Sequence, residues 1–272
     1  MIAIVDYGMG NLRSVQKAFE HLGTQAQITS TPNPLLQAQA VVLPGVGAFG
    51  AAIERLNRSE LVSTLERVIA EGKPFLGICL GLQLLFESSA ESPGIPGLGL
   101  LAGRAAGFRD REGFTLRVPH IGWSALHLTQ PQSPLWADIT EGSYVYFVHS
   151  YYLELHDSSH IIATCDYGGQ FACAVQYGNL YAVQFHPEKA ARSAYRSCAT
   201  FCGLWTALHA KRGSTPALAF RLRVMELEPP ADQLPSGIEG GAFQNLGTLG
   251  VDHDADAFQL IELVVGSGRF DG

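Results

Sequence analysis

The sequence predicts an α/β protein with a mostly parallel central sheet, helices on both faces and a strand-rich second half. In roughly the first 80 residues, short apolar runs alternate with segments whose apolar residues recur at helical spacing, which is typical of a doubly wound sheet. From about residue 100 to 186, short runs rich in β-branched and aromatic residues are separated by Gly, Pro, Asn and Asp. Such runs favour strands joined by turns.

The elements of the first half follow in order from these patterns. Strands are expected at residues 2–5, 26–29, 41–43 and 75–78, and helices at residues 12–22, 61–69 and 80–86. Gly23 and Gly72 lie near the ends of the first two helices, where glycine is favoured. Because ligands of parallel sheets gather at the carboxyl ends of the strands, the turns at residues 6–11, 44–50 and 79–81 are expected to meet at one edge.

In the second half, strands are expected at residues 114–118, 144–148, 161–165, 171–176 and 180–185, followed by a helix at residues 192–210. The pairs Gly168-Gly169 and Gly178-Asn179 are typical of hairpin turns. We therefore predict one domain over residues 1–210. Residues 211–272 are interpreted as an acidic C-terminal extension of unknown structure that contains Gly and Pro, with five basic and nine acidic side chains.

Composition excludes several classes of protein. The chain carries 18 basic and 25 acidic side chains, a formal charge of −7, so no basic surface for nucleic acid is expected. No apolar run reaches the roughly 18 residues that a membrane-spanning helix needs, and the first residues read as a strand rather than as an export signal. Five cysteines, an odd number, argue against a disulfide framework. We expect a cytoplasmic protein without a metal or cofactor.

A cysteine between two glycines is the first candidate for catalysis. Cys79 stands between Gly77 and Gly81, where a short apolar strand is expected to turn into a helix. Glycines at such a turn permit unusual backbone angles and clear side-chain bulk around the sulfur, as in a nucleophile elbow. The positive end of the following helix favours a thiolate. A lone cysteine is more often a small buried hydrophobe, but the glycine frame favours a nucleophile.

The tripeptide His186-Pro187-Glu188 supplies the groups that such a thiol needs. Proline disfavours helix for the residue before it, so His186 is expected to be extended, and residues two apart in an extended chain project to one face. Glu188 would then orient the imidazole of His186, which would act as the base for Cys79. The sequence alone does not show that residues 79 and 186 meet, and a His–Glu pair is commonly structural.

The segment at residues 45–50 matches the G-x-G-x-x-G pattern of dinucleotide sites. The acidic residue about 20 positions further on, Glu66, falls inside a predicted helix rather than at a strand end, which disfavours a nucleotide site. The alternative is that this turn aims a backbone N–H at the same point as the N–H of Leu80. Those two donors would stabilise an oxyanion.

Six ordered blocks of the sequence resemble the class I glutamine amidotransferases and, more narrowly, the glutaminase subunit of imidazole glycerol phosphate synthase. The resemblance extends from residue 1 to about residue 208. Ala190 departs from it, because the family usually has Ser after His-Pro-Glu-Lys. The blocks read DYGMGNL (residues 6–12), PGVGAF (44–49), GICLGLQLLF (77–86), VPHIGW (118–123), YFVHSY (146–151) and QFHPEK (184–189).

This resemblance implies a flavodoxin-like fold and a glutaminase reaction. Cys79 would attack the side-chain amide of glutamine, His186 would move the protons and Glu188 would orient His186. The resemblance also implies an oxyanion hole at Leu80, Val46 and Gly47, and a glutamine site lined by Gly45, Gln83, Glu91, Ser150 and Tyr151.

A partner is implied in the same way. The ammonia would pass to a barrel-shaped cyclase (synthase) subunit, bound in a heterodimer, that makes imidazole glycerol phosphate and aminoimidazole carboxamide ribonucleotide in histidine biosynthesis. The partner interface and ammonia passage would involve Asn11, Pro119, Trp123 and Tyr146, although Trp123 and Tyr146 could equally be rim packing. Three alternatives stay open: an amidotransferase that serves another synthase, such as surface-sugar amidination; a cysteine peptidase or γ-glutamyl hydrolase; and a non-catalytic scaffold.

Overall fold

The computed structural model describes residues 1–136 and 139–189 of the 272-residue chain. The helix expected at residues 192–210 and the extension at residues 211–272 lie outside the described residues. The two-domain division therefore stays a prediction.

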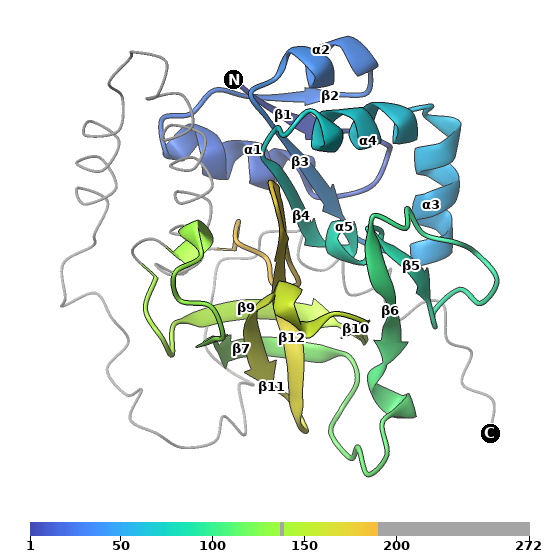
Figure 1. The fold of residues 1–272 in the computed structure, drawn as a ribbon, viewed down its shortest axis with the longest axis vertical. Helices are drawn as coiled ribbons and strands as arrows, with labels where there is room; N and C mark the ends of the chain where they lie inside the picture. Colours follow the sequence, from blue (N-terminus) through green and yellow to red (C-terminus); the bar gives the residue numbers. More distant parts are fainter. Residues whose placement is uncertain (137–138, 190–272) are drawn as a thin grey trace, which may run out of the picture. The chain divides into compact units, whose positions relative to one another are not determined.

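Eleven strands of the described part form one mixed sheet (Figure 1). Its main path runs β2-β1-β3-β4-β13-β12-β10-β6-β5, and β11 pairs with both β12 and β8. The pairs from β2 to β13 are parallel, and the pairs between β13 and β6 are antiparallel. The strands are β1 Ile2–Val5, β2 Ala26–Thr29, β3 Ala40–Gly45, β4 Phe75–Cys79, β5 Phe86–Ser89, β6 Leu101–Gly107, β8 His127–Leu128, β10 Tyr151–Leu155, β11 Ile161–Asp166, β12 Gln170–Tyr177 and β13 Leu180–Val183.

Helices cover both faces of the parallel part of this sheet. On β1, Ile2 and Ile4 join one apolar core with Phe19 of α1, while Ala3 and Val5 join a second core with α2, α3 and α4. Side chains alternate between the faces of a strand, so one short apolar strand supplies both cores. The helices are α1 Leu12–His21, α2 Pro32–Gln37, α3 Phe49–Arg58, α4 Val62–Ala70 and α5 Leu80–Gln83, with short 3₁₀ helices η1 Phe108–Asp110, η2 Pro134–Trp136 and η3 Ser158–His160.

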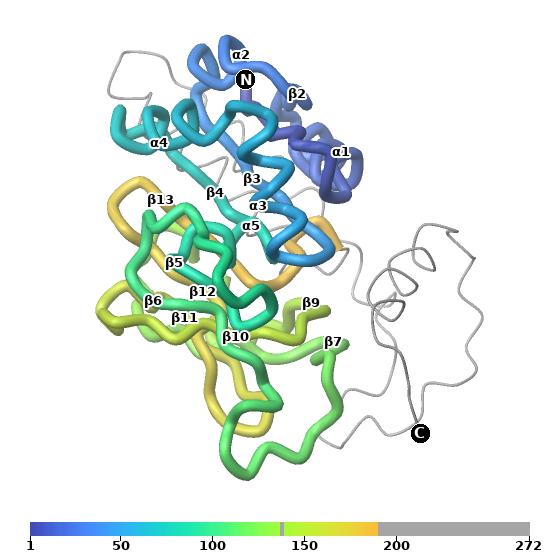
Figure 2. The backbone as a smooth tube through the Cα atoms, turned by 90° about the vertical axis from the view of Figure 1, so that its right-hand side faces the viewer, coloured from blue at the N-terminus to red at the C-terminus, as the bar shows by residue number. Residues whose placement is uncertain are grey.

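A separate two-stranded antiparallel sheet consists of β7 (His120–Ala125) and β9 (Tyr144–His149). Its inner face packs on the α1-side core through Val145 and Phe147. Its outer face carries Trp123, which is 45% exposed. Figure 2 shows β7 and β9 in the strand-rich half, away from the helices that surround β1, β3 and β4.

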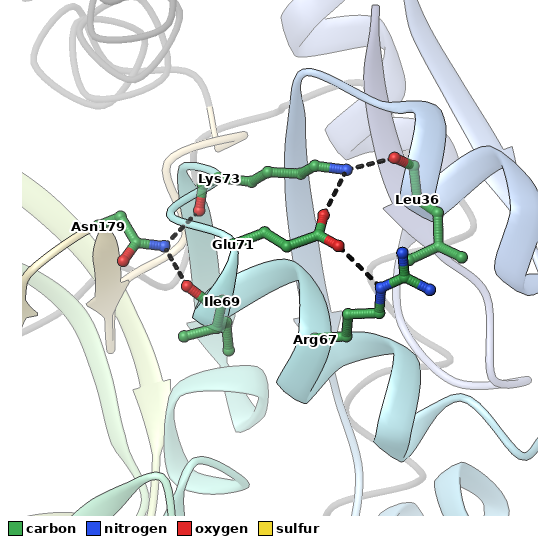
Figure 3. A network of polar contacts seen from close by, with 6 residues as sticks. All are labelled: Leu36, Arg67, Ile69, Glu71, Lys73 and Asn179. Atoms are coloured by element: carbon green, nitrogen blue, oxygen red, sulfur yellow. Dashed lines mark hydrogen bonds and ion pairs between the residues drawn. The ribbon is translucent and has the colours of Figure 1, made fainter.

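A polar network fixes the entry of β4 and β13 into the sheet (Figure 3). In the turn before β13, the Asn179 side chain donates to the carbonyl oxygens of Ile69 and Lys73, at 3.0 and 2.5 Å. The Asn179 carbonyl oxygen accepts from Phe75 N at 3.0 Å. Lys73 in turn donates to the carbonyl oxygen of Leu36 and pairs with Glu71, which Arg67 also contacts. These bonds set the parallel register in which Val183 faces Ile78, so the chain segments after both strands emerge side by side.

Most predicted strands and both hairpin turns are confirmed, and two predictions are wrong. Residues 114–118 form no strand. The helix expected at residues 80–86 ends after Gln83, because Phe86 begins β5 and pairs with Leu101 of β6. Further elements were not predicted from the sequence: α2, α3, β5, β6, β7, β8 and β10. Within the described residues, no helix is long and apolar enough to cross a membrane.

Candidate active site

Cys79 lies on a sharp turn between β4 and α5. Its backbone has φ 54° and ψ −112°, a left-handed conformation that residues other than glycine rarely adopt. Gly81 is required next to it, since a Cβ there would lie 1.9 Å from the carbonyl oxygen of Leu43. A Cβ at Gly77 would lie 3.0 Å from the Gly81 carbonyl oxygen. The structure thus confirms the elbow geometry predicted from the glycine frame.

His186 and Glu188 form a buried pair. His186 Nδ1 lies 2.7 Å from Glu188 Oε1, and both side chains are less than 5% exposed. The expectation that the chain runs extended from His186 to Glu188 is wrong. The chain turns at Pro187 and Glu188, and Lys189 N donates to the His186 carbonyl oxygen at 3.1 Å. The turn itself brings the carboxylate back to the imidazole.

The structure brings Cys79 and His186 together, as the elbow hypothesis requires. Burial disfavours the imidazolium, but the adjacent negative charges of Cys79 and Glu188 outweigh it and hold the pKa of His186 well above its ordinary value. Burial likewise opposes the Glu188 carboxylate, yet His186 keeps the pKa of Glu188 below its usual range. Glu188 therefore stays ionised and His186 is a strong proton acceptor for the thiol.

Sequence reasoning missed Gln184, which completes the surroundings of the sulfur. Gln184 is fully buried, and its Nε2 donates to Cys79 Sγ at 3.6 Å. Its Oε1 accepts from Gln83 Nε2 at 3.0 Å. Its position two residues before His186 was the available signal, because both emerge from the end of β13. Gln83, expected to hold glutamine, is itself buried and faces Gln184.

Tyr7, at the end of β1, was also missed. Its hydroxyl is buried and has no hydrogen-bond partner within the described part of the chain. Burial, and next the charge of Cys79, raise the pKa of Tyr7, so the hydroxyl keeps its proton. A Cβ placed on Gly45 would lie 2.7 Å from that oxygen, which shows how closely the tyrosine covers the glycine turn.

The glycine turn after β3 adjoins Cys79. Gly45 is the ladder partner of Cys79, and a Cβ on it would lie 2.9 Å from Gly81 N and 3.0 Å from Leu80 Cβ. Gly47 has φ 95°, which only glycine adopts readily. The turn containing Val46 and Gly47 therefore lies beside the start of α5. Glu66, as expected, falls within α4 and not at a strand end.

Two of the residues expected to bind glutamine lie close to each other. Glu91 Oε2 accepts from Phe49 N, the first residue of α3, at 2.8 Å, and burial raises the pKa of Glu91. The pKa of Tyr151 is raised by burial and then by the charge of Glu91. Ser150 directly precedes Tyr151, and its carbonyl oxygen accepts from Phe108 N at 3.2 Å.

Comparison with known proteins decides the family. The family described as glutamine amidotransferase class-I matches residues 3–199. The imidazole glycerol phosphate synthase subunit HisH of Rhodopirellula baltica is 51% identical over 189 residues, which are 70% of this chain and 90% of the relative. The HisH subunit of Syntrophotalea carbinolica is 46% identical over 204 residues, 74% of this chain and 98% of the relative. This chain is a class I glutamine amidotransferase of the HisH family.

Solved structures confirm the amidotransferase fold. A crystal structure titled glutamine amidotransferase superposes with a TM-score of 0.60 at 18% identity, over 75% of this chain and 99% of the other. The structure of PurLQS from Thermotoga maritima also gives 0.60 at 18% identity, over 75% and 97% of the two chains. At this identity the likeness concerns the fold alone.

The residues expected at the partner interface of this amidotransferase separate into two groups. Trp123 and Tyr146 are cross-strand neighbours on the outer face of the β7–β9 sheet, with ring centroids 5.4 Å apart. Pro119 directly precedes β7. Asn11 instead caps α1, because its Oδ1 accepts from Ser14 N at 3.3 Å. The β7–β9 sheet also touches the active site, since the Tyr146 carbonyl oxygen accepts from His186 N at 2.9 Å.

Proposed function

We propose that this chain is the glutaminase subunit of an imidazole glycerol phosphate synthase, with Cys79, His186 and Glu188 as its catalytic triad. It hydrolyses glutamine to glutamate and ammonia, and the ammonia serves histidine biosynthesis. The observation that carries the assignment is the left-handed elbow at Cys79 facing a buried His–Glu pair. The relatives of 46–51% identity named HisH support the choice of pathway.

The reaction follows from the positions of these groups. His186 Nε2 takes the thiol proton as Cys79 Sγ attacks the amide carbon of glutamine. The N–H groups of Leu80 and of the Val46–Gly47 turn hold the oxyanion of the tetrahedral intermediate. When the intermediate collapses, the C–N bond breaks and His186 returns the proton to the leaving nitrogen, which departs as ammonia. Water, deprotonated by His186, then cleaves the γ-glutamyl thioester and restores the thiol.

Glutamine is held between the elbow and the start of α3. The Glu91 carboxylate, set by Phe49 N, faces the α-ammonium group of the substrate. Gly45 leaves room for the amide beside Cys79, because any side chain there would meet Tyr7 and Leu80. Gln83, Ser150 and Tyr151 complete the walls. Exchange of Glu91 for Gln is expected to raise KM for glutamine more than it lowers kcat.

The outer face of the β7–β9 sheet docks the partner. Ile121, Trp123 and Tyr144 are 56%, 45% and 52% exposed, an apolar and aromatic composition typical of interface cores. The partner is a barrel-shaped cyclase subunit bound in a heterodimer. Because Tyr146 O holds His186 N, docking on this face adjoins the catalytic histidine and gives ammonia a short path across the interface.

The test is ammonia release from glutamine by the full chain, with and without the cyclase subunit and its nucleotide ligand. We expect low activity alone, a large rise with the cyclase, and none in Cys79→Ala. Ammonia release that persists in Cys79→Ala would refute the nucleophile. Full activity without the cyclase would refute coupling to it, and stimulation by a different synthase would identify another pathway.

A further inference from the structure

Two buried histidines outside the triad lie in a directed chain of hydrogen bonds. His120 and His149 face each other across the β7–β9 ladder, with His120 Nδ1 3.0 Å from His149 Nε2. At one end His120 Nε2 lies 2.9 Å from Ser124 Oγ. At the other end His149 Nδ1 lies 2.8 Å from the carbonyl oxygen of Tyr151. None of the reaction steps uses either ring.

The carbonyl end of the chain fixes the direction of every bond. A carbonyl oxygen only accepts, so His149 carries its proton on Nδ1 and accepts at Nε2. His120 must then donate from Nδ1 and accept at Nε2 from the Ser124 hydroxyl. Burial lowers the pKa of His120 to about 4 and that of His149 to about 3, so both rings are neutral and this single arrangement is populated at neutral pH.

The series of hydrogen bonds continues from Tyr151 to Cys79. The Tyr151 carbonyl oxygen has a second lone pair, and Gln83 Nε2 lies 3.5 Å from it. The other N–H of that amide donates to Gln184 Oε1 at 3.0 Å, and Gln184 Nε2 donates to Cys79 Sγ at 3.6 Å. These bonds orient both amides: Gln184 accepts through its carbonyl oxygen and donates to the sulfur, and Gln83 donates to both the Tyr151 and the Gln184 oxygens.

Aromatic rings enclose the histidine part of the chain. Phe108 and Phe171 lie with their centroids 5.2 Å from that of His149, and Phe147 lies 4.8 Å from His120. These rings surround the buried bond between His120 and His149, which makes that bond stronger and its loss more costly.

We propose that Ser124, His120, His149, the Tyr151 carbonyl, Gln83 and Gln184 form one positioning relay that holds the Cys79 sulfur for attack. The donor from Gln184 occupies one lone pair of the sulfur, which leaves the sulfur oriented toward His186 and glutamine. The histidines act through the other members and touch no reacting atom. The relay starts on β7, the strand that also carries Trp123, so it joins the outer sheet to the elbow.

The test compares two replacements of His149 in the full chain. An Asn side chain places its N–H near the position of Nδ1 and keeps the bond to Tyr151, whereas a Gln side chain reaches the position of Nε2 and loses that bond. The readouts are kcat, KM and the rate at which iodoacetamide labels Cys79, located by peptide mass spectrometry. His149→Gln is expected to lower kcat and labelling on the order of tenfold, as misplacement of a reacting group does, and His149→Asn to stay near the parent rate.

The second measurement compares the losses in two single variants with the loss in the double variant. Gln184→Met breaks the relay at the sulfur, and we expect the double variant with His149→Gln to lose no more than the larger single loss, because one break between His149 and the sulfur already frees the sulfur. Ser133→Ala is the matched control, since it removes a part-buried hydrogen bond of 2.6 Å to Gln176, which is not a member of the relay. If His149→Gln does not fold, Gln184→Met still tests the sulfur contact through slower labelling at unchanged KM.

Equal losses in His149→Asn and His149→Gln, or losses that multiply in the double variant, would overturn the relay. The inference rests on Cys79 as the nucleophile, and the two can fail separately. Ammonia release by Cys79→Ala would overturn the proposed function, whereas normal Cys79 labelling and turnover in His149→Gln would overturn the relay alone.

Discussion

Replacement of both buried histidines by glutamine, His120→Gln together with His149→Gln, is expected to change how the stability of the protein depends on pH. The native pKa values are about 4 and about 3, against an ordinary value of 6.5. A lowered native pKa means that the unfolded chain binds more protons than the native chain as the pH falls below 6.5. Stability present above pH 6.5 is therefore lost on acidification toward pH 4.

The size of the stability loss follows from the difference of one unit between pH 5.5 and the ordinary histidine pKa of 6.5. At pH 5.5 each unfolded histidine gains about 1.4 kcal/mol by protonation that the native ring does not gain, or about 3 kcal/mol for the pair. The figure depends only on both native pKa values lying well below 5.5. His186, whose pKa is raised, contributes with the opposite sign, but it does so equally in the parent and in the variant.

The assay is urea unfolding of the full chain at pH 7.5 and pH 5.5, followed by tryptophan fluorescence. The parent is expected to lose about 3 kcal/mol more than the double variant between the two pH values, although the variant starts from a lower stability. Ser133→Ala should lower stability by about 1 kcal/mol at both pH values and keep the parent slope. Equal pH slopes in the parent and the double variant would refute the assignment of two neutral buried histidines.

Further predictions concern the triad, the elbow, the docking face and the domain boundary. Glu188→Gln should lower kcat at least about a hundredfold, because the imidazolium loses its carboxylate; a smaller loss in steady-state ammonia release would argue against the triad. Gly81→Ala should destabilise the chain by more than about 3 kcal/mol in urea unfolding, since its Cβ meets the Leu43 carbonyl at 1.9 Å, while Gly113→Ala, which has open space but φ 72°, should lose only about 1 kcal/mol. Trp123→Ala should weaken binding of the cyclase at least about tenfold in calorimetry and leave basal ammonia release intact, and unchanged affinity would remove Trp123 from the interface. A chain truncated after Ala210 should retain cyclase-stimulated glutaminase activity, whereas loss of that activity would place the domain boundary later.

Local chemistry made much of this protein predictable. The glycines around Cys79 and the proline between His186 and Glu188 act within a few residues, and the alternating apolar residues of β1 and β3 report their burial directly. The elbow, the positions of the strands in the first half and the hairpins were accessible for this reason. β6, with the sequence LAGRAAG, was not, because Ala and Gly carry little strand preference and its pairing with β10 and β5 decides its conformation. Phe86 was wrongly predicted to be helical, because its pairing with Leu101 of β6 decides its conformation.

The sequence by itself predicted the residues that we propose as nucleophile, base and orienting acid, because each lies in a short motif whose backbone requirements are local. Only the tertiary structure decided what surrounds the sulfur. Gln184, Tyr7, His120 and His149 come from four separate strands or strand ends, and their roles depend on which donor meets which acceptor across the sheets. Hydrogen bonds between residues far apart in the chain are fixed by register and burial, neither of which a single segment of sequence encodes.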